Sequence, residues 1–284
     1  MKLIFFLLIS IFSARLAFAN ERTFVGSTPA HTTIRHFLRI PLTDSIDFIR
    51  WKLDLGIGTF KLRCTYGLAK PGTPGFSNEQ AVAFDGQLVA INNHYQLNYN
   101  GKEIFILEVD ANVLHFLDKD KQMLIGNGGY SFALNNTHPV AVKEVNIRSV
   151  QTSTESLLVF EGRTPCSDLP GLLGLNKSEA CNKMKWYFLL YTDSLTGKPA
   201  YFLMGGMGYR KETMAKGEWQ IATGENGRII YRLHFNKWVR PLNLLKGDDN
   251  ILFFIDSNGQ PLVGNEDFSY TLNRKKKEYA PVSR

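Results

Sequence analysis

The stretch Asn250–Asn273, NILFFIDSNGQPLVGNEDFSYTLN, decides the fold because the chain contains it twice. The earlier copy, Asn112–Asn135, reads NVLHFLDKDKQMLIGNGGYSFALN and aligns without a gap, with 11 identical residues over 24 positions. In each copy an apolar run, a polar turn and a second apolar run follow one another, which predicts strand, turn, strand. The interval between the copies exceeds the roughly 20 to 50 residues of solenoid repeats. We therefore expect each copy to end one whole domain.

The likeness between the halves extends upstream of these repeats. The segment Phe24–Ala30, FVGSTPA, matches Phe160–Cys166, FEGRTPC. A tryptophan then stands at the same step of two predicted strands, Trp51 in the first half and Trp186 in the second. Further matches are Phe60, Leu62, Cys64 and Tyr66 with Tyr201, Leu203, Gly205 and Met207 on the apolar side of a third strand, and Gly86-Gln87-Leu88 with Gly217-Glu218-Trp219.

The composition favours antiparallel β-structure in both halves. Aromatic residues make up 12% of the chain, glycine occurs 24 times, and long apolar stretches with helical spacing are scarce. Successive short strands joined by polar turns bury their edges best by closing into a barrel. We therefore predict an all-β fold of two tandem small antiparallel β-barrels. The expected organisation is a signal peptide at 1–19, a first barrel at 20–137, a linker at 138–156, a second barrel at 157–274 and a basic tail at 275–284.

The first residues have the three parts of a secretory signal peptide. A basic Lys2 precedes the apolar run Leu3–Phe12, and Ala17-Phe18-Ala19 supplies the small residues of a cleavage site. The apolar run is too short to span a bilayer comfortably. No cysteine follows it that could carry a lipid anchor. We therefore expect a periplasmic or secreted protein without a transmembrane segment.

Charge and motifs argue against nucleic-acid binding and catalysis. The formal net charge is +7, and much of the surplus lies in the tail Arg274–Lys277, which we interpret as a solvated end. No basic helix or aromatic ladder with RNA-binding spacing accompanies it. Nucleophile-elbow, P-loop and dinucleotide-binding motifs are absent from the sequence. We therefore predict a non-enzymatic protein that does not bind nucleic acid.

One loop of the second half resembles a known family. The segment Gly162–Leu172, GRTPCSDLPGL, is similar to the opening motif of the NlpE family, G-x-x-P-C-A-D-C-P-G-I. The later segments Gly217–Trp219, Ile255–Pro261 and Phe268–Leu272 follow in the family's order. The resemblance covers about 160–272, and the first half only through its likeness to the second. The matching motif residues are Gly162, Pro165, Cys166, Asp168, Pro170 and Gly171.

The resemblance implies a lipocalin-like barrel and a role in copper resistance or envelope-stress sensing. Copper is the one cofactor that it implies. However, the family's C-x-x-C is Cys166-x-x-Leu169 here, and a soft metal site needs two or more soft ligands. His31, in the first half's version of the loop, is a further candidate ligand. Met204 and Met207 are also candidates, although their spacing of three puts them on opposite strand faces and favours an ordinary bent barrel strand.

The three cysteines permit one disulfide. Cys166 and Cys181 lie in one segment and either close a loop, worth roughly 3 kcal/mol in the chain-entropy model, or remain free thiols. Closure would remove Cys166 from metal chemistry. Cys64 lies beside Leu62 and Tyr66 on the apolar side of its strand, so we expect a buried small hydrophobe. Asp168 we interpret as bonding to nearby backbone amides in the turn before Pro170.

Three functions are compatible with these observations. The first is an envelope binding or sensing protein related to copper homeostasis or envelope stress, with an unknown envelope protein as partner. The second is a carrier that holds a small apolar ligand inside a barrel. The third is a structural or protein-interaction module in which the barrels are solid. In that case Trp51, Trp186, Trp219 and Phe254 would fill the interiors.

Overall fold

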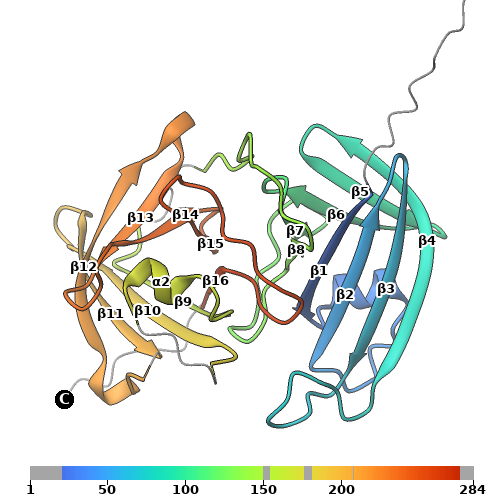
Figure 1. Cartoon of the computed structure of the whole chain (residues 1–284), viewed down its shortest axis with the longest axis horizontal. Coiled ribbons are helices and arrows are strands. Elements are labelled where there is room, and N and C mark those ends of the chain that lie inside the picture. Colours follow the sequence, from blue (N-terminus) through green and yellow to red (C-terminus); the bar gives the residue numbers. More distant parts are fainter. Residues whose placement is uncertain (1–20, 150–153, 176–180, 207, 276–284) are drawn as a thin grey trace, which may run out of the picture.

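The protein consists of two closed antiparallel β-barrels of eight strands each, one after the other along the chain (Figure 1). This computed structural model describes residues 21–149, 154–175, 181–206 and 208–275. The predicted all-β fold with two tandem barrels is confirmed. The predicted signal peptide, Met207 and most of the basic tail lie outside the described residues.

Each strand of the first barrel pairs with the next one along the chain, and β8 returns to pair with β1. A short helix, α1, follows β1. The elements are β1 (Arg22–Pro29), α1 (Thr32–Leu38), β2 (Phe48–Leu55), β3 (Thr59–Gly67), β4 (Gln80–Ile91), β5 (His94–Tyr99), β6 (Lys102–Glu108), β7 (Val113–Leu117) and β8 (Ala133–Asn136).

The second barrel repeats this order, with β16 closing on β9 and the short helix α2 after β9. Two 3₁₀ turns, η1 and η2, flank β12. The elements are β9 (Leu157–Thr164), α2 (Leu169–Leu173), β10 (Met184–Thr192), β11 (Pro199–Gly206), η1 (Lys211–Thr213), β12 (Ala215–Thr223), η2 (Glu225–Gly227), β13 (Ile229–His234), β14 (Leu242–Lys246), β15 (Ile251–Phe254) and β16 (Thr271–Arg274).

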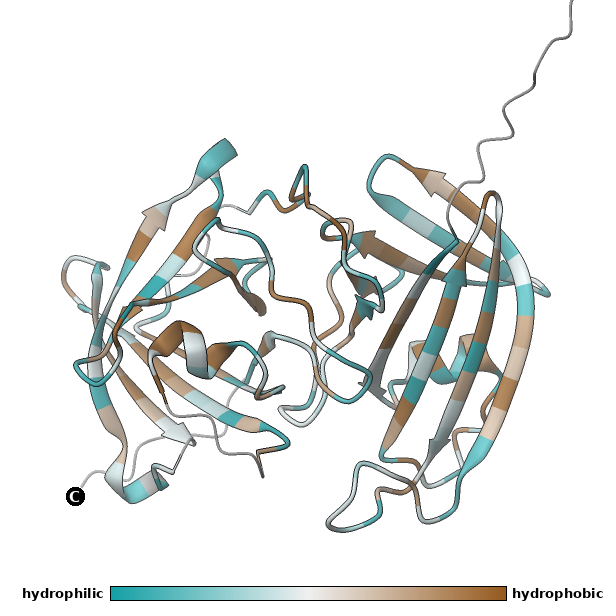
Figure 2. Cartoon of the chain, in the orientation of Figure 1, coloured by the Kyte–Doolittle hydropathy of each residue, from teal (hydrophilic) through white to brown (hydrophobic). Residues whose placement is uncertain are grey.

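Apolar and polar residues alternate along the strands, as the two colours of Figure 2 show on β2 and β3. On β3 the buried residues include Phe60, Leu62 and Cys64, while Lys61 and Arg63 between them are exposed. This period of two places one row of side chains inside the barrel and the other outside. The sequence pattern therefore fixes which strand face forms the core.

The predicted match of the third strands is wrong by one residue. Trp51 pairs with Cys64 in the first barrel, whereas Trp186 pairs with Gly206 in the second, so Gly206 rather than Gly205 corresponds to Cys64. The buried residues of β11 are consequently Phe202 and Met204, not Tyr201 and Leu203. A shift of one residue in a strand exchanges its two faces. The glycines at the end of β11 carry no apolar pattern that could have fixed the register.

Aromatic side chains fill both barrel interiors. Trp51, Trp186, Trp219 and Phe254 are all at most 3% exposed, which agrees with the expectation that they fill the core. The indole Nε1 of Trp51 donates to Thr28 Oγ1 at 2.9 Å, and that of Trp186 donates to Thr164 Oγ1 at the same distance. These bonds satisfy the one polar group that each buried indole brings into the core. The helices α1 and α2 add further apolar residues to the two cores: Ile34, Phe37, Leu38, Leu169 and Leu173.

The barrels meet through the two repeats, and we call residues at matching positions of the halves counterparts. Ser131 Oγ lies 2.5 Å from the Oγ of its counterpart Ser269, 138 residues later. Likewise the His115 ring meets its counterpart Phe253 at 5.9 Å between centroids. A residue touches its own counterpart when the contact follows a two-fold axis, as in a symmetric dimer. The halves of this chain thus pack like the subunits of such a dimer.

Two reciprocal hydrogen bonds lock this arrangement. Asn273 Oδ1 accepts from the amide N–H of Gly126 at 2.7 Å, and its counterpart Asn135 accepts from Gly264 at 2.7 Å. A third apolar cluster fills the junction between the barrels, including Val145 and Ile147 from the connecting segment. Its buried members are Leu107, Val109, Val113, Leu117, Met123, Ala133, Ile147, Leu245, Ile251, Phe253 and Ile255.

Candidate functional site: the motif loop and the groove between the barrels

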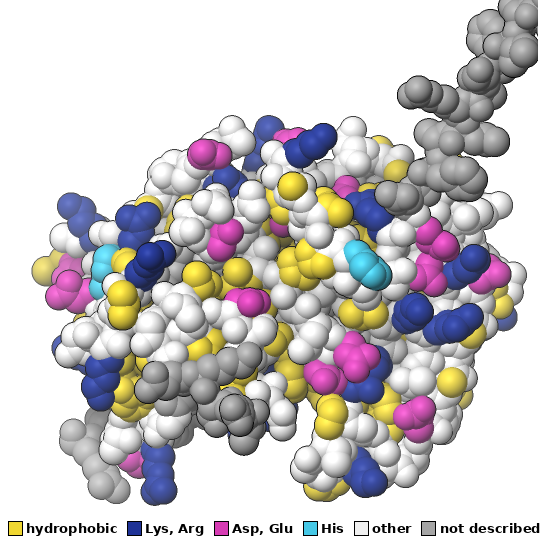
Figure 3. Space-filling model, in the orientation of Figure 1, with side chains coloured by type: hydrophobic (Ala, Val, Ile, Leu, Met, Phe, Trp, Pro, Cys, Tyr) yellow, Lys and Arg dark blue, Asp and Glu magenta, His cyan; other side chains and the backbone are white. Residues whose placement is uncertain are grey.

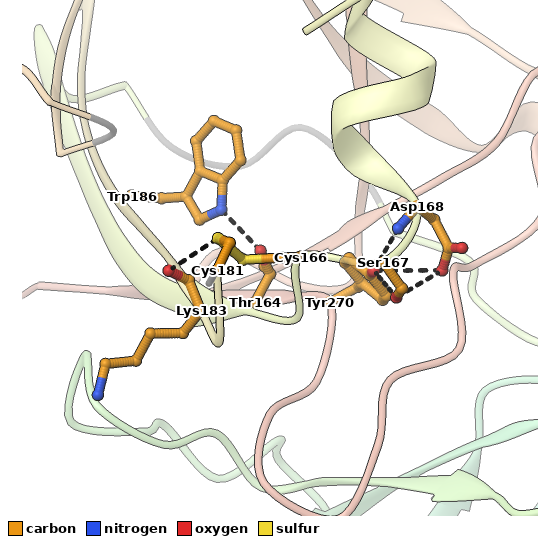
Figure 4. Close-up of a disulfide and its surroundings, with 8 residues drawn as sticks. All are labelled: Thr164, Cys166, Ser167, Asp168, Cys181, Lys183, Trp186 and Tyr270. Atoms are coloured by element: carbon orange, nitrogen blue, oxygen red, sulfur yellow. Dashed lines mark hydrogen bonds between the residues drawn. A yellow bond between two sulfur atoms is a disulfide. The ribbon is translucent and has the colours of Figure 1, made fainter. Parts of the chain in front are cut away.

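Of the two states that the sequence left open for Cys166 and Cys181, the structure shows the disulfide. Cys166 and Cys181 are bonded, with their Cα atoms 6.0 Å apart and a sequence separation of 15 (Figure 4). The bond ties the loop that carries α2 to the segment that leads into β10. Cys64 is free and buried inside the first barrel, as predicted, and burial raises the pKa of its thiol well above the ordinary value.

The role predicted for Asp168 is wrong. Asp168 precedes α2, but its backbone is helical, with φ −104° and ψ −37°, and its side chain makes no capping hydrogen bond. Instead its Oδ2 accepts from Tyr270 Oη at 3.2 Å, and the Asp168 amide donates to the same hydroxyl oxygen at 3.1 Å (Figure 4). The motif loop is therefore anchored on the second repeat. Burial raises the pKa of Tyr270 to about 12, so the hydroxyl stays protonated and can donate.

The other motif residues shape the loop. Gly162 is needed because a Cβ there would lie 2.7 Å from the carbonyl oxygen of Thr271, where β9 and β16 close the barrel. Pro165 is buried, and Pro170 lies in the first turn of α2, where a missing N–H costs no helical bond. Gly171 faces open space. The motif thus has a structural explanation in this chain.

The candidate metal ligands that the structure describes, Cys166, Met204 and His31, do not form a site. The Cys166 sulfur is bonded to Cys181, and Met204 is 0% exposed among the apolar residues of the second barrel. His31 belongs to the first barrel, where its Nδ1 accepts from the Thr33 amide at 3.3 Å. Within the described ranges, no group of three or more His, Cys, Asp or Glu side chains could hold a metal ion. The residues present therefore do not fit the copper centre that the resemblance implies.

A groove of about 490 Å³ lies beside the motif loop, between the two barrels. One wall is the loop between β3 and β4 of the first barrel, and the other is the disulfide-bonded segment of the second. Figure 3 shows one face of the molecule, on which hydrophobic side chains are visible along the line where the barrels meet. The groove is lined by Gly72, Thr73, Pro74, Tyr130, Pro165, Cys166, Ser167, Cys181, Asn182, Lys183, Asn265, Asp267 and Phe268.

Four stacked rings run across the junction at this groove. Phe76 stacks on Phe48 at 4.2 Å between centroids, and Phe48 stacks on Tyr130 at 4.7 Å. Tyr130 lies parallel to its counterpart Phe268 of the other barrel, with centroids 6.1 Å apart. The ammonium group of Lys183 lies 5.6 Å from the centroid of the Phe268 ring. Of these rings Tyr130 and Phe268 line the groove, and with the nearby ammonium group of Lys183 they give it an aromatic surface with a positively charged end.

The sequence did not reveal this site, because residues from both barrels build it. The motif loop pointed to one wall of the groove through Pro165 and Cys166. The opposite wall, at 72–74, consists of ordinary turn residues that match no functional motif in the sequence. The one available signal was the repeat itself, because a copied segment that ends two domains is suited to pair with its own copy.

Comparisons with known proteins do not add to this picture. No family model matches the chain, and neither the curated proteins nor the solved structures include a match. The class that the fold defines is thus a tandem of two filled eight-stranded antiparallel barrels. Within the described part of the chain, no helix is long and apolar enough to cross a membrane.

Proposed function

We propose that this protein is a non-enzymatic binding module of the bacterial envelope, and that it takes its ligand between the barrels rather than inside them. The observation that carries the proposal is the contrast between the two kinds of space. The barrel interiors are filled with buried aromatic residues, whereas the groove at the junction is open and combines aromatic, polar and charged side chains. Binding sites with a few polar groups on an apolar floor are typical of ligand recognition.

The envelope location and a relation to the NlpE family are part of this proposal. The location rests on the signal-like residues 1–19, and the relation rests on the Gly162–Leu172 motif within a barrel of the expected kind. The filled interiors argue against the carrier function. A role in copper homeostasis receives no support from the positions of Cys166, Met204 and His31.

A selection of peptides from a displayed random library tests the proposal. We expect the selected peptides to bind the intact protein and to lose binding when Asn182→Trp fills the groove, because Asn182 is exposed and lines it. The matched control is Leu195→Trp. Leu195 is 94% exposed in the turn after β10, at the other end of that strand from the groove.

Two results would contradict the proposal. One is that the selected peptides bind the Asn182→Trp variant as tightly as the parent protein. The other is stoichiometric binding of an apolar dye that Asn182→Trp leaves unchanged, because that result would place the ligand inside a barrel.

A further inference from the structure

Among the described residues, a charged pair spans the junction on one side of its two-fold axis and has no equivalent on the other side. Arg50 Nη2 of the first barrel lies 2.5 Å from Asp267 Oδ1 of the second. The counterpart of Arg50 is Lys185, since each stands one residue before the tryptophan of its strand. The counterpart of Asp267 in the repeat is Gly129. On the other side of the axis the cation is therefore present and the carboxylate is missing.

The turn around Gly129 makes the same side-chain hydrogen bonds as the turn that holds Asp267, although Gly128 has a φ of +72° and its counterpart Glu266 has no positive φ. Asn127 Oδ1 accepts from the amides of Gly129 and Tyr130 at 3.0 and 2.9 Å. The counterpart Asn265 accepts from Asp267 and the residue after it at the same two distances. A Cβ built on Gly129 would lie 3.5 Å from Arg163 Nη1. The chain thus keeps the hydrogen bonds of the turn, has no carboxylate at this position, and places the Arg163 guanidinium group beside it.

Three cations gather at this place. Arg163 and Lys185 are directly opposite each other on the paired strands β9 and β10, an arrangement that like charges disfavour. Lys183 lies just before β10, interacts electrostatically with both Arg163 and Lys185, and lines the groove. In the part of the chain that the structure describes, these three residues have no ion-pair partner.

The two acidic side chains near these cations are already paired with other basic residues. Glu161, which lies against Gly128, has its Oε2 3.5 Å from Lys275 Nζ. Asp267 is bound to Arg50. Partial burial lowers the pKa of Lys183, and the positive charges of Arg163 and Lys185 lower it further, while Asp267 opposes them. The site therefore holds uncompensated positive charge that an outside carboxylate would neutralise.

We propose that an acidic peptide segment binds in the junction groove with a carboxylate on Arg163, Lys183 and Lys185, in the place that Asp267 occupies on the other side. The same chain already contains an example of this interaction, since Asp267 presents a carboxylate from a peptide segment to Arg50. The groove also exposes the polar side chains of Asn182 and Asn265, which can bond a peptide backbone. This inference rests on the proposed function of the groove and names the class of its ligand.

The test introduces a carboxylate at position 129 by substitution and measures its effect on peptide binding. Isothermal calorimetry at low salt would use a capped tetra-aspartate peptide as probe. We expect Gly129→Asp to weaken binding of the probe by roughly ten-fold or more. The new carboxylate would pair with the cationic side chains that the probe needs. Gly129→Asn, which has the same shape without the charge, should keep the affinity of the parent protein within about two-fold. Both variants should fold, since Gly129 does not have a left-handed φ and a Cβ there would meet only side-chain atoms, the nearest being Asn127 Oδ1 at 3.2 Å.

A second measurement follows from the same variant. Gly129→Asp should raise the melting temperature of the ligand-free protein relative to Gly129→Asn, and the difference should disappear in roughly 1 M salt, where charges are screened. Arg163→Ala should remove both the difference and the binding of tetra-aspartate.

Three outcomes would overturn the inference. They are equal binding of capped tetra-asparagine, unchanged binding to Gly129→Asp, and binding of inorganic phosphate as tight as that of the peptide, which would indicate a simple anion site. Failure of tetra-aspartate to bind the parent protein would also overturn it. In that case peptides selected from the random library would still test the proposed function of the groove independently.

Discussion

Replacing His115 with phenylalanine should make the protein more stable in acid while changing little at neutral pH. His115 is fully buried at the junction, where it faces its counterpart Phe253 with the rings at 84°. Its Nδ1 bonds to the Phe116 carbonyl at 2.9 Å, while its Nε2 has no hydrogen-bond partner among the described residues. Burial lowers the pKa of His115 from 6.5 to about 4, because a charged imidazole would lose its hydration there.

The magnitude follows from this shift in pKa. Between about pH 6.5 and pH 4 the unfolded chain binds a proton at His115 and the folded protein does not, so this residue makes stability fall with falling pH. The full difference corresponds to about 3 kcal/mol at pH 4. In His115→Phe this loss is absent. The Phe116 carbonyl keeps a second donor, the amide of Leu124 at 3.0 Å, so the variant leaves no carbonyl unpaired.

Urea unfolding of both proteins from pH 4 to pH 7.5, followed by tryptophan fluorescence, measures the difference in the free energy of unfolding. We expect the variant to be within about 1 kcal/mol of the parent protein at neutral pH, and to gain on it steadily toward pH 4. Asp110 titrates in the opposite sense, because burial raises its pKa to about 6, but it is present in both proteins and cancels in the difference. A difference that does not vary with pH would refute the reasoning.

Three other predictions test separate parts of the structure. Asn135→Ala and Asn273→Ala should each lower the free energy of unfolding by about 2 kcal/mol, since each strips a glycine amide at the junction of its acceptor; urea unfolding would check this, and unchanged midpoints would contradict it. Gly162→Ala should lower the free energy of unfolding by about 1 to 3 kcal/mol through its clash with the facing strand. Gly171→Ala, with open space around it, should not. Equal urea midpoints for the two variants would contradict this prediction and show that the barrel can relax. Cys166→Ser should cost roughly 3 kcal/mol through loss of the disulfide and leave Cu(I) affinity unchanged; a loss of tight Cu(I) binding in calorimetry would instead restore the copper role.

The fold was predictable because the repeat and the alternation of apolar residues are local patterns. On β3 the alternation of Phe60, Leu62 and Cys64 with polar residues identifies the core face without knowledge of the barrel. On β11 no such alternation identifies the core face, because Tyr201 and Leu203 are as apolar as their buried neighbours and the glycines that follow cannot fix the register. The disulfide was left open by the sequence, since spacing permits closure but does not bring two sulfur atoms together.

The candidate site was less predictable, because it depends on contacts between distant segments. Asp168 was expected to bond to its own turn, and only the folded chain brings Tyr270 to it, 102 residues away. The pairing of Arg50 with Asp267 spans 217 residues and leaves no local pattern. The difference between Asp267 and Gly129 is visible in the aligned repeats. It acquires a meaning only once the two copies are known to face each other.

The central claim is that the two repeats meet face to face and thereby form the junction that holds the groove. The most direct measurement is a cysteine pair at Ser131 and Ser269, whose Oγ atoms are 2.5 Å apart. In Ser131→Cys/Ser269→Cys we predict a spontaneous second disulfide, so that thiol titration in denaturant finds only the Cys64 thiol, as in the parent protein. Two additional free thiols in the oxidised double variant would contradict the account.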